Sequence, residues 1–105
     1  MKANTKTKKI EMYSGKTQKI TLQCINPLLD TMIEKFGRRG VTYTKVDDKH
    51  FSVETTVDVS NQFYGWLLGF GKRVRLISPD DIVAEFKKYI DKIKHDYRDL
   101  YIYSS

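Results

Sequence analysis

The sequence has a single cysteine, Cys24, among its 105 residues. One thiol cannot form an intramolecular disulfide, which argues against a small disulfide-stabilised secreted module and indicates a reducing compartment. Cys24 falls in the apolar register of a strand pattern, where a thiol behaves as a small hydrophobic side chain. We therefore expect Cys24 to pack in the core rather than to act as a nucleophile.

Long apolar segments are also missing. The longest apolar run, within residues 63–71, falls well short of the roughly 20 residues needed to span a bilayer. The lysines near the N-terminus are not followed by an apolar stretch, so the start of the sequence does not have the pattern of a secretory signal peptide. We expect a cytoplasmic protein that has no membrane partner.

Proline is rare, and both prolines stand where helices are expected to begin. Pro27 follows Asn26, a residue type that caps helices, and Pro79 follows Ser78. The aspartates at residues 80–81 add negative charge where the helix dipole favours it. The two prolines therefore mark helix starts rather than breaks inside helices.

Positive charge is abundant but unevenly placed. The net charge is +6 and the pI is near 9.4, a balance that suggests nucleic-acid binding. Residues 1–20 carry six lysines against Glu11, whereas residues 21–105 carry thirteen basic and twelve acidic side chains. We interpret residues 1–16 as a basic flexible leader or linker remnant, and residues 17–105 as a single domain.

Apolar periodicity alternates between strand and helix spacing along the chain. Residues 18–25 and 72–77 alternate as strands do, and residues 41–59 predict a hairpin whose turn lies near residues 47–49. Helical spacing and capping residues predict helices over residues 26–37, 60–71 and 78–97. The conformation of residues 98–105, including Tyr101 and Tyr103, stays open.

This order of elements predicts an α+β fold. One-sided strands and amphipathic helices are best satisfied by one antiparallel sheet with helices on one face. The order strand, helix, strand, strand, helix, strand predicts the ferredoxin-like βαββαβ arrangement. The helix over residues 78–97 is then an additional C-terminal helix.

Several motifs resemble the C-terminal extension of WYL-domain transcriptional regulators, called the WCX domain. They are the "FG" that ends the first helix, the "FSV" strand at residues 51–53, "GWLLGFG" at residues 65–71, "VRLISP" at residues 74–79 and the long last helix. "MYSG" at residues 12–15 is similar to the connector that leads out of the WYL domain. The resemblance covers about residues 11–97.

The resemblance implies a role in bacterial transcription regulation. Such regulators combine a DNA-binding helix-turn-helix, a ligand-sensing WYL domain and this extension, which helps form a homodimer and packs near the WYL domain of the same or the partner chain. In some members the extension helps hold a nucleotide or single-stranded nucleic-acid ligand. The present sequence contains neither the helix-turn-helix nor the WYL motif. The alternative is a stand-alone binding module for nucleic acid or for a protein.

The candidate contact residues lie on the strand over residues 72–77. Alternation places Arg73 and Arg75 on the face opposite the apolar residues, with Lys72 at the strand start. Paired guanidinium groups suit phosphate, and Gln23 of the first strand is expected on the same face. The alternative is that these charges only keep an exposed sheet face soluble. With the resemblance, we favour a contact surface for the WYL domain or its ligand.

The helix over residues 60–71 is too apolar for every side chain to face the core. Its inward stripe is expected to hold Phe63, Trp66 and Phe70, which leaves Tyr64 and Leu68 toward the edge. Two interpretations stay open for this pair. Tyr64 and Leu68 are either partly exposed residues of a small protein or an interface with a second chain or domain.

Catalytic and RNA-binding patterns are missing. The expected open face holds Thr21, Gln23, Ser52, Glu54 and Thr56 rather than the aromatic residues on which an RNA-recognition sheet stacks bases. The two histidines share no ligand spacing with the carboxylates or the cysteine. We predict that the protein is not an enzyme and uses neither a cofactor nor a metal.

Overall fold

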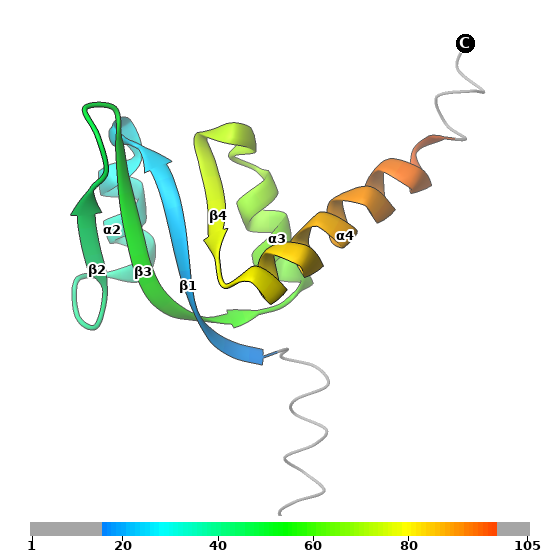
Figure 1. The fold of residues 1–105 in the computed structure, drawn as a ribbon, viewed down its shortest axis with the longest axis horizontal. Coiled ribbons are helices and arrows are strands. Elements are labelled where there is room, and N and C mark those ends of the chain that lie inside the picture. Colours follow the sequence, from blue (N-terminus) through cyan, green and yellow to red (C-terminus); the bar gives the residue numbers. More distant parts are fainter. Residues whose placement is uncertain (1–15, 99–105) are drawn as a thin grey trace, which may run out of the picture.

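The computed structural model describes residues 16–98 and has the predicted α+β class. In chain order the elements are β1 (Lys16–Ile25), the 3-10 turn η1 (Asn26–Leu28), α2 (Leu29–Phe36), β2 (Thr42–Lys45), β3 (His50–Val59), α3 (Asn61–Leu68), the 3-10 turn η2 (Gly71–Arg73), β4 (Val74–Ser78) and α4 (Asp80–Asp96). Figure 1 shows these elements as one sheet with its helices.

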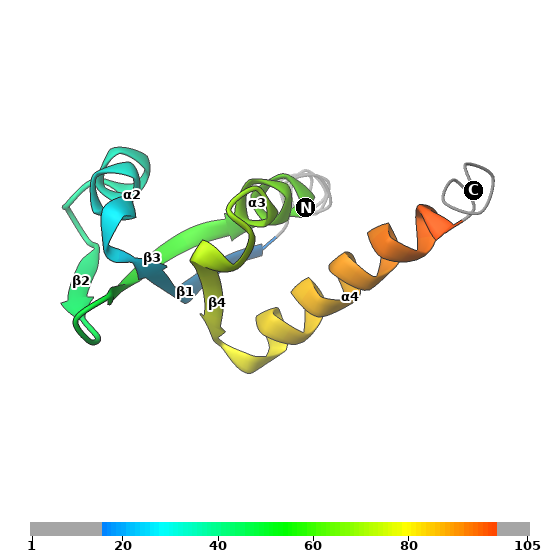
Figure 2. The same ribbon diagram turned by 90° about the horizontal axis from the view of Figure 1, so that it is seen from above.

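The four strands form one antiparallel sheet in the order β2-β3-β1-β4. The two long strands, β1 and β3, pair over their whole length at the centre, and the short strands lie at the two edges. Seen from above, α2 and α3 lie on the same side of the sheet (Figure 2). The last helix, α4, starts at the end of β4 and extends away from the sheet.

The core lies between the sheet and the first two helices. Alternate residues of β1 and β3 point into it, as period-two strands require, and Cys24 is fully buried among them, as predicted. The buried apolar residues are Ile20, Leu22, Cys24, Met32, Phe51, Val53, Val59, Phe63, Tyr64, Leu67, Val74, Leu76 and Ile82.

Helix ends follow local chemistry, with three differences from prediction. The last helix, α4, begins at Asp80 with Pro79 at its N-cap position, so Ser78 does not cap it. Gly37 adopts a φ of 78° directly after α2, the left-handed region expected of a glycine stop. The helix itself begins at Leu29 rather than Asn26, because residues 26–28 form the tighter 3-10 turn. The next helix, α3, ends at Leu68, earlier than the predicted stop at Gly71.

The predicted strand over residues 72–77 begins two residues later than expected. Gly71 has a φ of 61°, and the backbone N–H of Arg73 donates to the carbonyl of Phe70 at 3.1 Å. This bond holds Lys72 and Arg73 in the turn η2, so β4 starts at Val74. The strand placement of Lys72 and Arg73 was therefore wrong.

The predicted buried face of α4 is also too long. Ile82 is fully buried, but the apolar residues farther along are only half-buried, and Tyr97 is 62% exposed. Distance from the sheet explains this, because the helix extends past it (Figures 1 and 2).

Two predictions about the ends of the chain stay predictions: the boundary after residue 16, and the tail with Tyr101 and Tyr103. Residues 1–15 and 99–105 lie outside the described residues. No helix within residues 16–98 combines the length and hydrophobicity that crossing a membrane requires.

The capping of α3 gives a direct test of the fold. The Ser60 hydroxyl accepts a hydrogen bond from the backbone N–H of Phe63 at 3.2 Å. Ser60→Ala should lower the free energy of unfolding by about 1 kcal/mol, because this N–H loses its partner. Urea denaturation measures the effect. Ser52→Ala on the open face is the control and should change stability by less than about 0.5 kcal/mol; equal losses would contradict the cap.

Candidate functional site

The face of the sheet opposite α2 and α3 is polar. One row across the four strands consists of Thr44, Ser52, Gln23 and Arg75, which are direct cross-strand neighbours. Gln23 and Arg75, predicted to share this face, therefore lie side by side on β1 and β4. This row offers a guanidinium group, an amide and two hydroxyls, which together can hydrogen-bond a phosphate, a carboxylate or a polar backbone.

The neighbouring row provides the acidic group of this face. Thr21 is opposite Glu54, and the Glu54 carboxylate lies 3.8 Å from the ammonium group of Lys19. Both side chains are largely exposed, so this ion pair contributes little to stability. Glu54 thus interacts with Lys19 rather than with an arginine, and Arg75 stands at the β4 end of the face without an acidic cross-strand neighbour.

Arg73 does not join Arg75 on this face. The Arg73 Nε–H donates to the carbonyl oxygen of Phe70 at 3.1 Å, and its guanidinium carbon lies 5.5 Å from the centre of the Phe70 ring. These contacts hold the side chain against the preceding turn. The predicted pair of guanidinium forks is therefore wrong in geometry. Arg75 remains on the open face, and Lys72 is exposed on the adjoining turn η2.

Tyr64 lies inside the protein rather than at an exposed edge. Its ring lies 5.3 Å, between ring centres, from both Phe86 and Tyr89 of α4, and only 5% of the residue is exposed. Its hydroxyl donates to Oε1 of Glu85 at 3.1 Å. Burial, followed by the nearby Glu85 carboxylate, raises the pKa of Tyr64 to about 12. The expectation that Tyr64 lies toward the surface was wrong.

Leu68 differs from Tyr64 in exposure and in the surface that it lines. It is half-buried and lines a groove of about 570 Å³ between α3, β4 and α4. Tyr64 instead lines a different depression, on the side of α4 that carries Glu85 and Lys88. The two residues therefore do not form one continuous surface.

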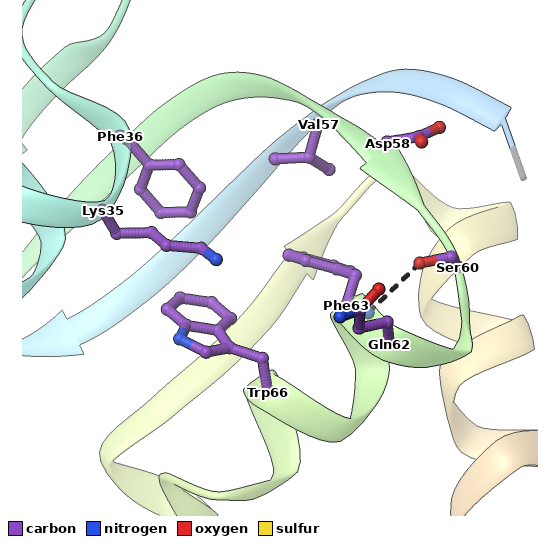
Figure 3. A pocket seen from close by; sticks show the side chains of 8 residues that line it. All are labelled: Lys35, Phe36, Val57, Asp58, Ser60, Gln62, Phe63 and Trp66. Carbon is purple, nitrogen blue, oxygen red and sulfur yellow. Dashed lines mark hydrogen bonds between the residues drawn. The ribbon is translucent and has the colours of Figure 1, made fainter. Parts of the chain in front are cut away.

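A second hollow, which the sequence pattern did not reveal, lies between α2 and α3 (Figure 3). It measures about 340 Å³, and its walls are the rings of Phe36, Phe63 and Trp66. The Trp66 ring is stacked with Phe63 at 6.0 Å and meets Phe36 edge-on at 5.7 Å. The Lys35 ammonium group lies 4.9 Å from the Trp66 ring centre, a cation–π contact.

This hollow combines an aromatic surface with charged side chains. Aromatic rings supply the apolar surface, and the lining carries one charge of each sign, from Lys35 and Asp58. The rings were predicted to be inward-facing within their own helices. Their meeting across two helices depends on tertiary packing, so no local signal in the sequence could have found it.

Asp47 and Cys24 are held in structural roles. Oδ1 of Asp47 accepts hydrogen bonds from the backbone N–H groups of Lys49 and His50, both at 2.8 Å, and from Nδ1 of His50 at 2.9 Å. The bond from His50 is the main cause of the lowered pKa of Asp47. Burial raises the pKa of the Cys24 thiol to about 11. Within residues 16–98, no group of three histidine, cysteine or acidic side chains is placed to hold a metal ion.

Comparison with known proteins identifies one family. The WCX domain matches residues 17–93, which is most of the chain and nearly all of its described part. The match confirms the resemblance that the sequence motifs predicted. No curated protein matches the sequence.

The contact between Tyr64 and Glu85 should stabilise the attachment of α4. Tyr64→Phe removes the hydroxyl and should lower the free energy of unfolding by about 1 kcal/mol, because a partly buried hydrogen bond is lost while the ring packing remains. Thermal or urea denaturation measures the change. Tyr97→Phe at the exposed end of α4 is the matched control and should have no measurable effect; a silent Tyr64→Phe would show that the bond contributes nothing.

Proposed function

Because the chain belongs to the WCX domain family, we propose that it is a regulatory accessory domain of a WYL-type bacterial transcription regulator. In this role it reads no DNA itself. It links the state of a ligand-sensing WYL domain to the arrangement of the regulator dimer, so that a ligand shifts the population of DNA-binding dimers. The family match over residues 17–93 is the observation that carries this proposal.

The open face of the sheet is the proposed contact surface for the WYL domain or its ligand. Interfaces between domains of one chain are commonly polar, and this face offers hydrogen-bonding groups across four strands. Gln23 on β1 and Arg75 on the edge strand β4 lie side by side toward one end of this face, and Lys72 extends the positive surface at η2. A phosphate of a nucleotide or of single-stranded nucleic acid suits the planar guanidinium of Arg75.

Homodimerisation is the second part of the proposal, and α4 is the element that supports it. Beyond its first turns the helix leaves the sheet (Figures 1 and 2), and its half-buried Ile90 and Ile93 and exposed Tyr97 lie along it. An apolar stripe that its own domain does not cover is suited to a partner surface. We assign the dimer contact to this stripe in place of Tyr64 and Leu68.

The finer fold assignment also belongs to this proposal. In the order β2-β3-β1-β4, α2 connects β1 and β2 across β3, and α3 connects β3 and β4 across β1. Two such split βαβ units support the ferredoxin-like assignment, with α4 as the added helix.

We further propose that the domain is not an enzyme and is cytoplasmic. Two observations support this: the Cys24 thiol is buried and, with a pKa near 11, is protonated at neutral pH, and the Asp47 carboxylate is engaged in holding the turn between β2 and β3.

The open face can be tested directly with a short single-stranded oligonucleotide. Gln23→Ala/Arg75→Ala should weaken its binding about tenfold, because a charge-assisted contact to phosphate is lost. Fluorescence anisotropy measures the affinity. Arg73→Ala is the matched control, since Arg73 lies off the open face, and it should leave the affinity within about twofold of the parent value.

The same titration separates the proposed role from a stand-alone nucleic-acid module. Residues 16–105, which retain all of β1, should bind as the whole chain does. If binding is instead lost when residues 1–15 are deleted, weakens steeply as salt is raised and is unchanged by the substitution of Arg75, the basic leader is the binding element. The open face is then not a ligand surface.

The dimer contact on α4 predicts a second outcome. Ile93→Glu should weaken self-association at least about tenfold, because a charge would be buried in an apolar contact. Sedimentation velocity over a range of concentrations measures the association. Lys94→Glu, next to it on the same helix and fully exposed, is the control. A dimer that tolerates Ile93→Glu would place the interface elsewhere.

A further inference from the structure

Within residues 16–98, no strand pairs with the outer edge of β4. In the sheet order, β4 is the last strand and β1 is its one neighbour among the described strands. The backbone N–H and C=O groups on the other side of such a strand are available to pair with an extended segment. Figures 1 and 2 both show α3 and α4 on this side of β4, away from β1.

An apolar groove of about 570 Å³ lies along this edge. Its walls come from the end of α3, from η2 and from α4, and β4 contributes residues of both of its faces, including Leu76 and Ile77. Ile77 is 43% exposed, so its side chain adds accessible apolar surface to the groove. Leu68, Val83, Phe86 and Ile90 supply the other apolar side chains that line the groove.

The charge of the groove indicates what it accepts. Lys72, Arg75 and Lys87 line it, and no aspartate or glutamate does. In the described part of the chain, these three cations take no part in the ion pairs that form, which involve Lys19, Lys45 and His50. A second copy of β4 in this place would bring the same cations together, and like charges across an interface are unfavourable. An acidic occupant is complementary.

We propose that β4 accepts an extended acidic segment of another domain or protein as a fifth strand of the sheet. Backbone hydrogen bonds to the unpaired edge of β4 supply affinity that does not depend on the sequence of the added segment. Side chains of the added strand alternate between two faces. Apolar side chains of the added strand pack against the apolar lining of the groove, and its acidic side chains meet the cations along that lining. This inference does not depend on the proposed regulatory role.

A designed peptide tests the pairing with the whole chain. The probe is the acetylated, amidated peptide EIEVEIE, titrated into isotope-labelled protein and followed by NMR. We expect chemical-shift changes confined to β4, η2 and the groove side of α4, with slower amide exchange along β4 as its outer N–H groups become bonded. The reversed-charge peptide KIKVKIK should produce no such changes.

Two neighbouring lysines of α4 provide a matched pair of variants. Lys87 lines the groove, whereas Lys88 lines the depression on the other side of the helix. Lys87→Glu should weaken binding of EIEVEIE about three- to tenfold, because an attraction becomes a repulsion, and Lys88→Glu should leave it nearly unchanged. Equal effects of the two variants would mean that general charge, not the groove, attracts the peptide, and would overturn the proposal.

Backbone methylation of the peptide distinguishes strand addition from binding by side chains alone. Successive amides of a strand point to opposite edges, so methylating either the glutamate amides or the isoleucine and valine amides should abolish binding, while methylating the other set should preserve it. The proposal would be overturned if both methylated peptides bound equally well, or if millimolar peptide caused no chemical-shift changes. It would also be overturned if the same resonances changed with protein concentration alone, a result that would indicate a second copy in the groove.

Discussion

The pairing of β1 with β3 is the constraint on which the rest of the structure depends. These strands align residue by residue from Lys16 opposite Val59 to Ile25 opposite His50. This register puts Leu22 and Val53 on the helix-covered face and leaves Gln23 and Ser52 on the open one. A slip by one residue would exchange the two faces, so the core, the polar surface and the places of both edge strands follow from this one alignment.

Local chemistry explains why much of the fold was predictable. The strand periods, the Ser60 cap and the left-handed Gly37 each depend on a few neighbouring residues, and each lies where the sequence placed it. The errors depend on distant contacts. Tyr64 is covered by a helix that begins sixteen residues later in the chain, at Asp80, and no helical period indicates which neighbour covers a side chain.

The candidate surfaces likewise divide into features that local sequence predicts and features that depend on distant contacts. Gln23 and Arg75 were predicted to share a face, because alternation along two strands is enough to place them there. The separation of Arg73 from Arg75 was missed, since it results from the turn that Gly71 allows and from the contacts of Arg73 with Phe70. The aromatic hollow around Trp66 and the groove beside β4 require elements from different parts of the chain, so both became visible only in the folded structure.

The attachment of α4 supports the proposed role between other domains. The helix is held at its beginning, where Ile82 is fully buried and Tyr64 contacts Phe86 and Tyr89. Most helix stability in proteins comes from tertiary packing of an apolar face, and the far end of α4 receives little packing from its own sheet. A partner that covers Ile93 and Tyr97 would therefore stabilise the end of α4 while it buries apolar surface. That same contact would fix the direction of the helix relative to the sheet, so an event at one end of the domain could be transmitted to a neighbour at the other.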